Sequence, residues 1–248
     1  MRKYISIFEL FARSTIYKIL SVLVAMGAIQ VVMFCKAMLE WFPADSYHLD
    51  FQAIEYYTLE YMMDRSKSTI FLGIAFVVIT VILCWNGCNI GSKSSYTIQR
   101  LQVTEKKIFM MQSIYNSLCY LLLLGTQIGV FFIQSSLYAA RAGHLTNQTI
   151  FLAYYRNDFM HSVLPLEGTV RWGINILIVL GCGILAAMFT YLQRRGKTAG
   201  ALLVVVACVL FGFVQELGEV LGFMIVVIIW LIVGFQVYWN LIQKKEGE

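Results

Sequence analysis

Six long apolar blocks constrain this chain more than any other feature of its sequence. They lie at about Ile19–Leu39, Thr69–Asn89, Ile108–Tyr138, Trp172–Leu192, Ala199–Val214 and Val220–Ile242. A helix needs about 20 consecutive apolar residues to cross the hydrocarbon core of a bilayer. The only two prolines, Pro43 and Pro165, fall outside the blocks, and no block alternates apolar with polar residues as barrel strands do. The sequence therefore predicts an all-α integral membrane protein with six transmembrane helices, forming a single transmembrane domain over residues 1–248.

The charge distribution predicts the orientation of these helices. Lys and Arg gather in the segments before the first block, between the second and third, between the fourth and fifth, and after the sixth. Acidic residues gather in the segments 41–68 and 139–171. Because basic residues stay on the cytoplasmic side, we expect both termini in the cytoplasm and these two acidic segments as extracellular loops. The net charge of +5 is thus a topology signal, and we expect lipid bilayer rather than nucleic acid as the surrounding partner.

Residues 1–18, before the first block, have an amphipathic pattern. Arg2, Ser6, Glu9 and Arg13 are spaced by three or four residues, and aromatic and aliphatic residues fill the other side. This pattern predicts an interfacial helix that lies along the membrane surface. The alternative is a plain N-terminal extension of the first span. In the first loop we expect a short helix near Phe51–Met63, and in the second loop the apolar stretches are too short to span.

No residue pattern in the chain indicates an enzyme. Gly196-Lys197-Thr198 resembles the end of a phosphate-binding loop, but the glycine required five residues earlier is Tyr191. The three histidines are dispersed in the predicted extracellular loops, and the six cysteines lie in or beside apolar blocks. We therefore expect no catalytic residue, no metal site and no cofactor bound by this chain.

Residues 91–107 form a polar cytoplasmic segment that runs directly into the third block. Within it and just beyond stands Arg100-Leu101-Gln102-Val103-Thr104-Glu105-Lys106-Lys107-Ile108-Phe109. This stretch resembles the coupling segment in permease subunits of type-two ATP-binding-cassette (ABC) exporters. The family pattern has proline at Gln102 and a basic residue at Glu105. The length of the chain, the six spans, the interfacial helix and the cytoplasmic termini are also similar to that family.

The resemblance implies a transport subunit without ATPase activity of its own. In that family the coupling segment docks on a separate ATPase subunit, which carries the ATP and magnesium, and two permease chains pair as a homodimer or heterodimer. Carried over to this sequence, the ATPase-coupling residues are Arg100, Leu101, Val103, Thr104, Glu105, Lys106 and Lys107. The location implied is a bacterial cell membrane, with peptide antibiotics, toxic amphiphiles or lipids as the exported cargo.

The third block carries a stripe of polar residues on one helix face. The stripe consists of Gln112, Asn116, Tyr120, Gln127 and Gln134, spaced by four or seven residues. Polar side chains inside a membrane avoid lipid, so we expect these to face other helices or to line a transport path. Two glycine pairs, Gly125-x-x-x-Gly129 and Gly218-x-x-x-Gly222, would permit close helix approach.

The fifth block is short for a complete span and is followed at once by two acids, Glu216 and Glu219. The block either crosses fully or is re-entrant, as short elements in that permease family are. Glu216 and Glu219 are either an extracellular gate at membrane depth or a solvated hairpin tip. A secondary transporter, or a substrate-binding membrane subunit without an ATPase, is the alternative function. It should show inverted repeats or buried charges within the spans.

Overall fold

A computed structural model describes residues 2–41, 58–87, 104–142, 146–166, 168–197, 200–214 and 219–242. The regular structure in these ranges is entirely helical, and none of the described residues forms a strand. The prediction of an all-α chain is therefore confirmed for these ranges.

Within the described ranges, five helices are long and apolar enough to cross a membrane. They are α1 (Arg2–Trp41), α3 (Ser68–Gly87), α5 (Glu105–Ala142), α8 (Thr169–Arg194) and α10 (Glu219–Val237), the last extended by a π-helical turn, η3 (Tyr238–Ile242). Each contains or closely matches one of the predicted spans. The molecule is a membrane protein with at least five helices of spanning length.

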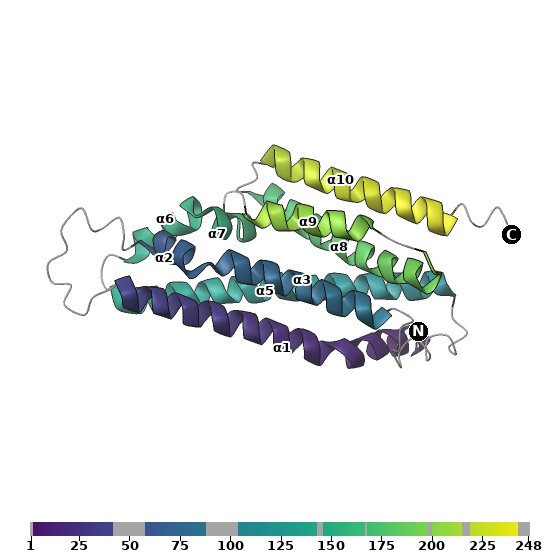
Figure 1. Cartoon of the computed structure of the whole chain (residues 1–248). Helices are drawn as coiled ribbons and strands as arrows, with labels where there is room; N and C mark the ends of the chain where they lie inside the picture. The colour runs from purple at the N-terminus through teal and green to yellow at the C-terminus, as the bar shows by residue number, and fades with distance from the viewer. Residues whose placement is uncertain are drawn as a thin grey trace.

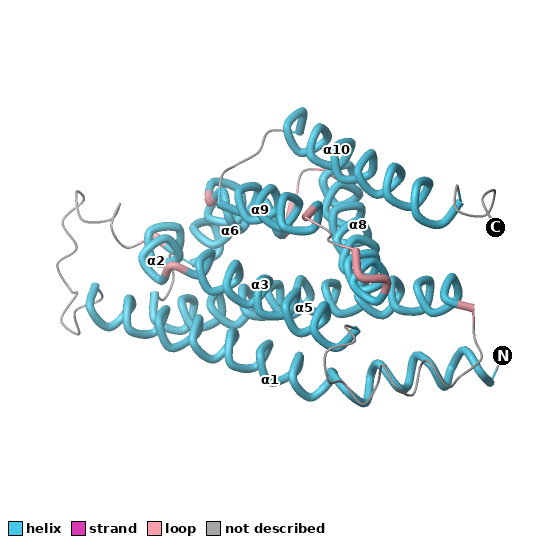
Figure 2. The backbone as a smooth tube through the Cα atoms, turned by 45° about the vertical axis from the view of Figure 1, so that its right-hand side comes forward, coloured by secondary structure: helices cyan, strands magenta, loops and turns pink. Residues whose placement is uncertain are grey.

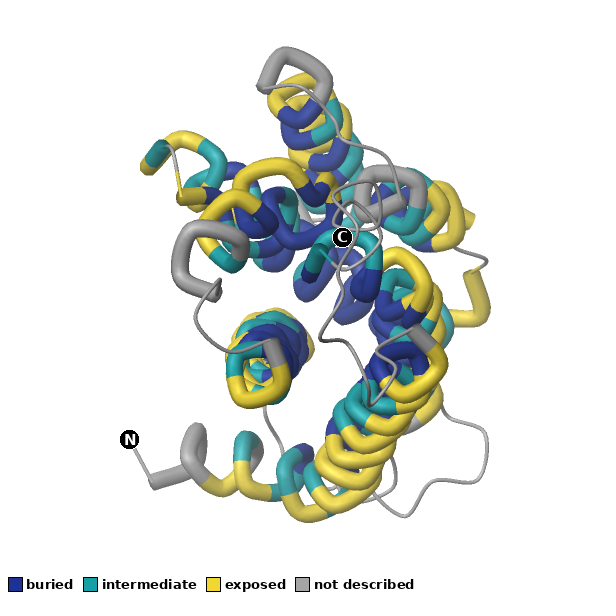
Figure 3. Tube along the Cα trace, turned by 90° about the vertical axis from the view of Figure 1, so that its left-hand side faces the viewer, coloured by how far each residue is buried: buried dark blue, intermediate teal, exposed yellow. Residues whose placement is uncertain are grey.

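The outward faces of these helices carry many large apolar side chains. In the spanning part of α10 only 22% of the residues are buried within the chain, yet the same stretch is strongly apolar. Phe223, Leu231 and Phe235 of this helix are each more than half exposed. Figure 3 shows the same division across the bundle, with buried residues on the inner sides of the helices and exposed residues outside. Helices with apolar outward faces are stable in a lipid bilayer, because exposing these side chains to lipid costs far less free energy than exposing them to water.

The fifth block forms a shorter helix, α9 (Ala201–Val214), of 14 residues. At 1.5 Å per residue it is about 21 Å long, less than the roughly 30 Å of a hydrocarbon core. Figure 1 shows α9 within the bundle, alongside α8 and α10. The start of α1 and the end of α10 lie at the same end of the bundle, which we call the terminal end (Figure 1).

Three short helices gather at the opposite end, which we call the capped end (Figure 1). They are α2 (Leu59–Ser66), α6 (Thr146–Arg156) and α7 (Asp158–Val163). The short helix expected near Phe51–Met63 is thus seen as α2, displaced toward the first residues of α3; residues 51–57 lie outside the described ranges. The second predicted loop also contains helices, and these are too short to span, as expected.

Hydrogen bonds from side chains organise the capped end. Thr58 caps α2 by accepting from the Tyr61 amide at 3.4 Å, and Asn157 caps α7 by accepting from the Met160 amide at 3.0 Å. The same Asn157 donates through Nδ2 to Asp64 Oδ1 of α2 at 2.9 Å. One amide side chain therefore joins two short helices that are far apart in the sequence.

In the N-terminal segment 1–18 the structure agrees with the alternative, a helical extension of the first span, and the interfacial position stays a prediction. Helix α1 continues through Lys18 without interruption, although its first turns bend away from the rest of its axis (Figures 1 and 2). The polar stripe is exposed at Ser6, Glu9 and Arg13, but Phe11 is only 2% exposed and its ring stacks on Tyr115 of α5. At Phe11 the apolar side of this segment therefore packs against α5.

Candidate functional site

Helix α5 is the centre of the bundle and carries the predicted polar stripe. All five stripe residues are buried, with at most 2% of each side chain exposed. α5 packs along α8 and α1 and also contacts α3. Each stripe residue forms a hydrogen bond to one of these neighbouring helices or to the turn of chain beside them, as the next paragraphs describe.

Gln127 lies in a glutamine pair near the capped half of α5. Its Nε2 donates to Oε1 of Gln30 in α1 at 3.0 Å, and Nε2 of Gln30 donates back to Oε1 of Gln127 at 2.9 Å. The Gln30 amide also donates to the carbonyl of Ser68 at 3.1 Å, at the start of α3. Three helices are thus joined at a point where neither glutamine is exposed at all.

Gln134 extends this network by two turns. Its Nε2 donates to the Gln30 carbonyl at 3.3 Å and to the Ser68 hydroxyl at 3.4 Å. The Ser68 hydroxyl in turn lies 2.8 Å from the hydroxyl of Ser66, which closes the turn between α2 and α3. This turn passes through Lys67, whose φ of 53° is left-handed. The polar network therefore fastens the capped-end turn to the spanning helices.

The remaining three stripe residues contact α3 and α8. The Tyr120 hydroxyl lies 2.8 Å from the Thr80 hydroxyl of α3. Asn116 donates to the Gly183 carbonyl of α8 at 3.5 Å, and Gln112 accepts from Arg194 at the same distance. Tyr120 also lines an interhelical cavity, which the other four stripe residues do not line. Apart from Tyr120, the stripe residues are thus described only in contacts between helices or with the turn before α3. That the stripe lines a transport path stays a prediction.

The coupling segment enters the described structure only at its last residues. Arg100, Leu101 and Val103 lie outside the described ranges. Thr104 precedes α5, and its carbonyl accepts from the amides of Lys107 and Ile108 at 2.9 and 3.3 Å. Thr104, Lys106 and Lys107 are exposed at the terminal end.

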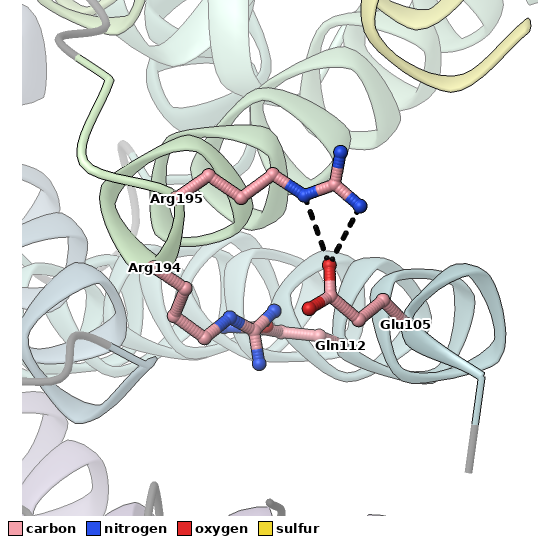
Figure 4. Close-up of polar contacts among 4 residues, drawn as sticks. All are labelled: Glu105, Gln112, Arg194 and Arg195. Carbon is pink, nitrogen blue, oxygen red and sulfur yellow. Dashed lines mark hydrogen bonds and ion pairs between the residues drawn. The ribbon is translucent and has the colours of Figure 1, made fainter. Parts of the chain in front are cut away.

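Glu105 contacts helix α8 across the terminal end, as Figure 4 shows. Its Oε2 lies 3.1 Å from both Nε and Nη2 of Arg195, the residue that follows the last turn of α8. The guanidinium of Arg195 also lies over the Tyr191 ring, 4.5 Å from its centre. Arg194, one residue earlier, extends toward Gln112 instead (Figure 4). The acid that departs from the permease pattern thus binds its own chain.

The predicted gate residues are only partly within the described structure. Glu216 lies outside it, and Glu219 is the first residue of α10, described for its backbone alone. Whether the two acids form a gate stays a prediction.

Gly218 lies outside the described ranges, and among the described glycines the tightest helix contacts fall outside the predicted pairs. A Cβ at Gly125 or at Gly129 would meet nothing within 4 Å, whereas one at Gly222 would touch Ile174 at an ordinary distance. A Cβ at Gly183 would lie 2.8 Å from the backbone nitrogen of Ser117 in α5. The α5–α8 contact therefore requires glycine at 183, a position outside the two predicted glycine pairs.

Two contacts of the structure, Gln30 with Gln127 and Arg195 with Glu105, are not predicted from the sequence. Gln30 is the lone amide in the middle of the first apolar block, and that isolation was a usable signal of a buried partner. Arg195 lies in the basic segment between the fourth and fifth blocks, and nothing in the sequence links it to Glu105.

Comparison with protein-family models, with curated proteins and with solved structures finds no match to this chain.

Proposed function

We propose that this chain is the transmembrane permease subunit of an ABC exporter in a bacterial cell membrane. It has no ATPase activity of its own; ATP and magnesium are held by a separate ATPase subunit. Two permease chains and two ATPase subunits form the working transporter. The support is the coupling-like stretch Arg100–Lys107 and the arrangement of the helix that follows it.

The topology that goes with this proposal has six spans and both termini in the cytoplasm. The terminal end is the cytoplasmic end, and the capped end is extracellular. The start of α1 and the end of α10 lie at the same end of the bundle, and this agrees with an even number of membrane passes. Helix α9 supplies the fifth pass. The basic residues near the terminal end agree with this orientation, and the bent first turns of α1 lie at the cytoplasmic interface.

One observation carries the proposal: α5 is an uninterrupted helix of 38 residues that joins the coupling stretch to the bundle. Its first residue, Glu105, is paired with Arg195 of α8. Its buried stripe forms hydrogen bonds to α1, α3 and α8 along its length. A displacement that an ATPase imposes on Arg100–Lys107 would therefore move a rigid rod with contacts to three other helices. Such an arrangement is a means of coupling ATP hydrolysis to helix tilting.

At the extracellular end, movement of α5 and α8 changes the position of α9 and α10, which pack on α8. Glu216 and Glu219, between α9 and the body of α10, then act as the gate. Acidic side chains at membrane depth are costly unless they face water or a cation, so an opening suits such residues better than a lipid surface does.

Affinity purification of the full chain in mild detergent tests the ATPase partner. We expect an ATPase subunit to co-purify, and to be lost when Arg100–Lys107 is replaced by Gly and Ser. The matched control replaces the exposed basic residues of the capped end, Arg65 and Lys67, with Gly and Ser. A stably inserted protein that never retains an ATPase would contradict the proposal and would favour a secondary transporter or a substrate-binding subunit instead.

A further inference from the structure

An open groove of about 630 Å³ lies between the first turns of α1 and the outer side of α5. Phe8, Ala12 and Ile16 line it from α1, in the turns that bend away from the rest of the helix axis (Figure 2). The lining from α5 runs from Tyr115 to Thr126. The volume lies within the roughly 300–1,000 Å³ that is usual for sites that hold small molecules.

A small residue gives the groove its depth. Gly125 lines it, and a Cβ at this glycine would meet nothing within 4 Å. Leu118 and Leu122, which also line it, are 43% and 47% exposed, so the groove opens onto the outer surface of the bundle. Gly129, one turn beyond Gly125, is equally open but does not line the groove. A large side chain at position 125 would therefore fill the groove, whereas one at position 129 would not.

The polar groups in the lining are already satisfied within the chain. The Thr126 hydroxyl donates to a carbonyl of its own helix at 2.7 Å. The Thr15 hydroxyl donates to a carbonyl of its own helix at 2.8 Å, so it accepts from the Tyr115 hydroxyl, 2.6 Å away. The thiol of Cys119 behaves as a small apolar group, and none of the described lining residues is charged. The groove therefore suits an alkyl chain, which brings no polar group that would be buried without a partner.

The groove has the length of a lipid chain in one leaflet. At 1.5 Å per residue, the distance from Tyr115 to Thr126 along α5 is about 16 Å, which is about half of the roughly 30 Å hydrocarbon core. Both lining helices are of spanning length, so their outer surface faces the bilayer. The first turns of α1 lie at the terminal end (Figure 1), and Thr126 lies near the middle of α5. The groove therefore belongs to the leaflet at the terminal end.

We propose that this groove binds one acyl chain of a bilayer phospholipid from the leaflet at the terminal end. A bound chain gains dispersion contacts with two helix walls, which are packed more densely than fluid lipid chains. A helix of a second copy fits less well. With its side chains a helix is about 10 Å wide, so a length of about 16 Å needs roughly 1,300 Å³, about twice the volume of the groove. The inference requires only that α1 and α5 lie in a membrane, and it does not depend on the proposed export function.

Photocrosslinking tests the site in the full chain reconstituted into phosphatidylcholine nanodiscs. The probe is a phosphatidylcholine with a diazirine in one acyl chain, diluted with the unlabelled lipid, and peptide mass spectrometry locates the adducts. Exposed side chains of α10, such as Phe223, Leu231 and Phe235, report labelling by the surrounding lipid. We expect the groove residues to be labelled about threefold to tenfold more than these, because a bound chain stays longer than a passing one. Equal labelling of the groove and of α10 would overturn the inference.

A matched pair of glycine substitutions sharpens this test. Gly125→Leu should lower the groove yield to that of α10, because the new side chain occupies the site, and Gly129→Leu should leave it unchanged. Thermal melting shows whether each variant is folded. Ala12→Leu, on the α1 wall, should also lower the yield and replaces Gly125→Leu if that variant does not fold. Full groove labelling in a folded variant with a filled groove would contradict the proposal.

Cysteine crosslinking tests the rival occupant, a second copy of the chain. Leu122 lines the groove and is nearly half exposed. In native membranes we expect Leu122→Cys to form no more crosslinked dimer than the unaltered protein, because lipid fills the groove. Dimers specific to Leu122→Cys, and lost when Gly125→Leu is added, would assign the groove to a second copy and reject the lipid site.

Discussion

Gln30 of α1 and Gln127 of α5 exchange two side-chain hydrogen bonds, at 2.9 and 3.0 Å, in a fully buried part of the bundle. An amide pair of this kind satisfies a donor and an acceptor on each side chain at once. In a membrane protein such a contact sets the register between two helices, because a shifted register would leave amides unpaired among apolar groups.

We expect Gln127→Leu to destabilise the protein by about 1–2 kcal/mol, since it leaves the Gln30 amide partly unpaired. Gln30→Leu should cost a similar amount, and the double variant less than the two single costs together. A double-mutant cycle on the free energy of unfolding measures this coupling. Gln236→Leu, in α10 and outside this network, is the control. Strictly additive single costs would show that the pair carries no coupling.

A second prediction concerns the contact of α5 with α8 at Gly183. Gly183→Ala should destabilise the protein by about 1–3 kcal/mol, because the new Cβ would lie 2.8 and 2.9 Å from backbone atoms of Ser117. Gly173→Ala, in the same helix, should be neutral or stabilising, because its Cβ would meet nothing within 4 Å. Thermal melting in detergent compares the two. Equal melting temperatures of the two variants would contradict the prediction, because they would show that α5 and α8 accommodate the extra methyl group without loss of stability.

The Glu105–Arg195 pair is half exposed, so its removal should change global stability by less than about 1 kcal/mol. Its effect should be local. Glu105→Arg should speed hydrogen exchange of the Lys107 and Ile108 amides by about twofold to fivefold, because the first turn of α5 loses its contact with α8. The double variant Glu105→Arg/Arg195→Glu should restore slow exchange. Lys106→Glu is the control, and the same acceleration in that variant would argue against the pair.

The capped end should lose stability as pH rises above the acidic range. Burial, with the nearby carboxylates of Asp64 and Asp158, raises the pKa of Glu60, and burial likewise raises the pKa of Asp64. The folded state therefore holds these protons more tightly than the unfolded chain does. Stability then falls as pH rises from the unfolded pKa values through the higher folded ones.

Asp64→Asn tests this pH dependence, since it removes the charge and keeps an oxygen that can accept from Asn157. We expect its melting temperature to depend less on pH between about 4 and 7 than that of the unaltered protein. Glu9→Gln, in α1 near the terminal end, is the control. An unchanged pH profile in Asp64→Asn would show that this carboxyl does not titrate abnormally.

Much of the helical architecture could be predicted from the sequence, and the reasons are local. Apolar blocks of about 20 residues without proline form helices because a membrane leaves the backbone few other ways to satisfy its hydrogen bonds. The 3.6-residue period then decides which side chains share a face, as it did for Gln112 through Gln134. Length alone separated α9 from the five longer apolar helices. The expectation for residues 1–18 was less accurate, because an amphipathic pattern does not say whether lipid or another helix covers its apolar side.

What the sequence by itself determined is therefore which segments are helices and which faces of them avoid lipid. Only the tertiary structure decided which residues meet across those faces. It brings Gln30 to Gln127, Gly183 to Ser117, and Glu105 to Arg195. The physical reason is that helix periodicity is a property of neighbours along the chain, whereas contacts between helices depend on register, tilt and close packing of segments up to about a hundred residues apart.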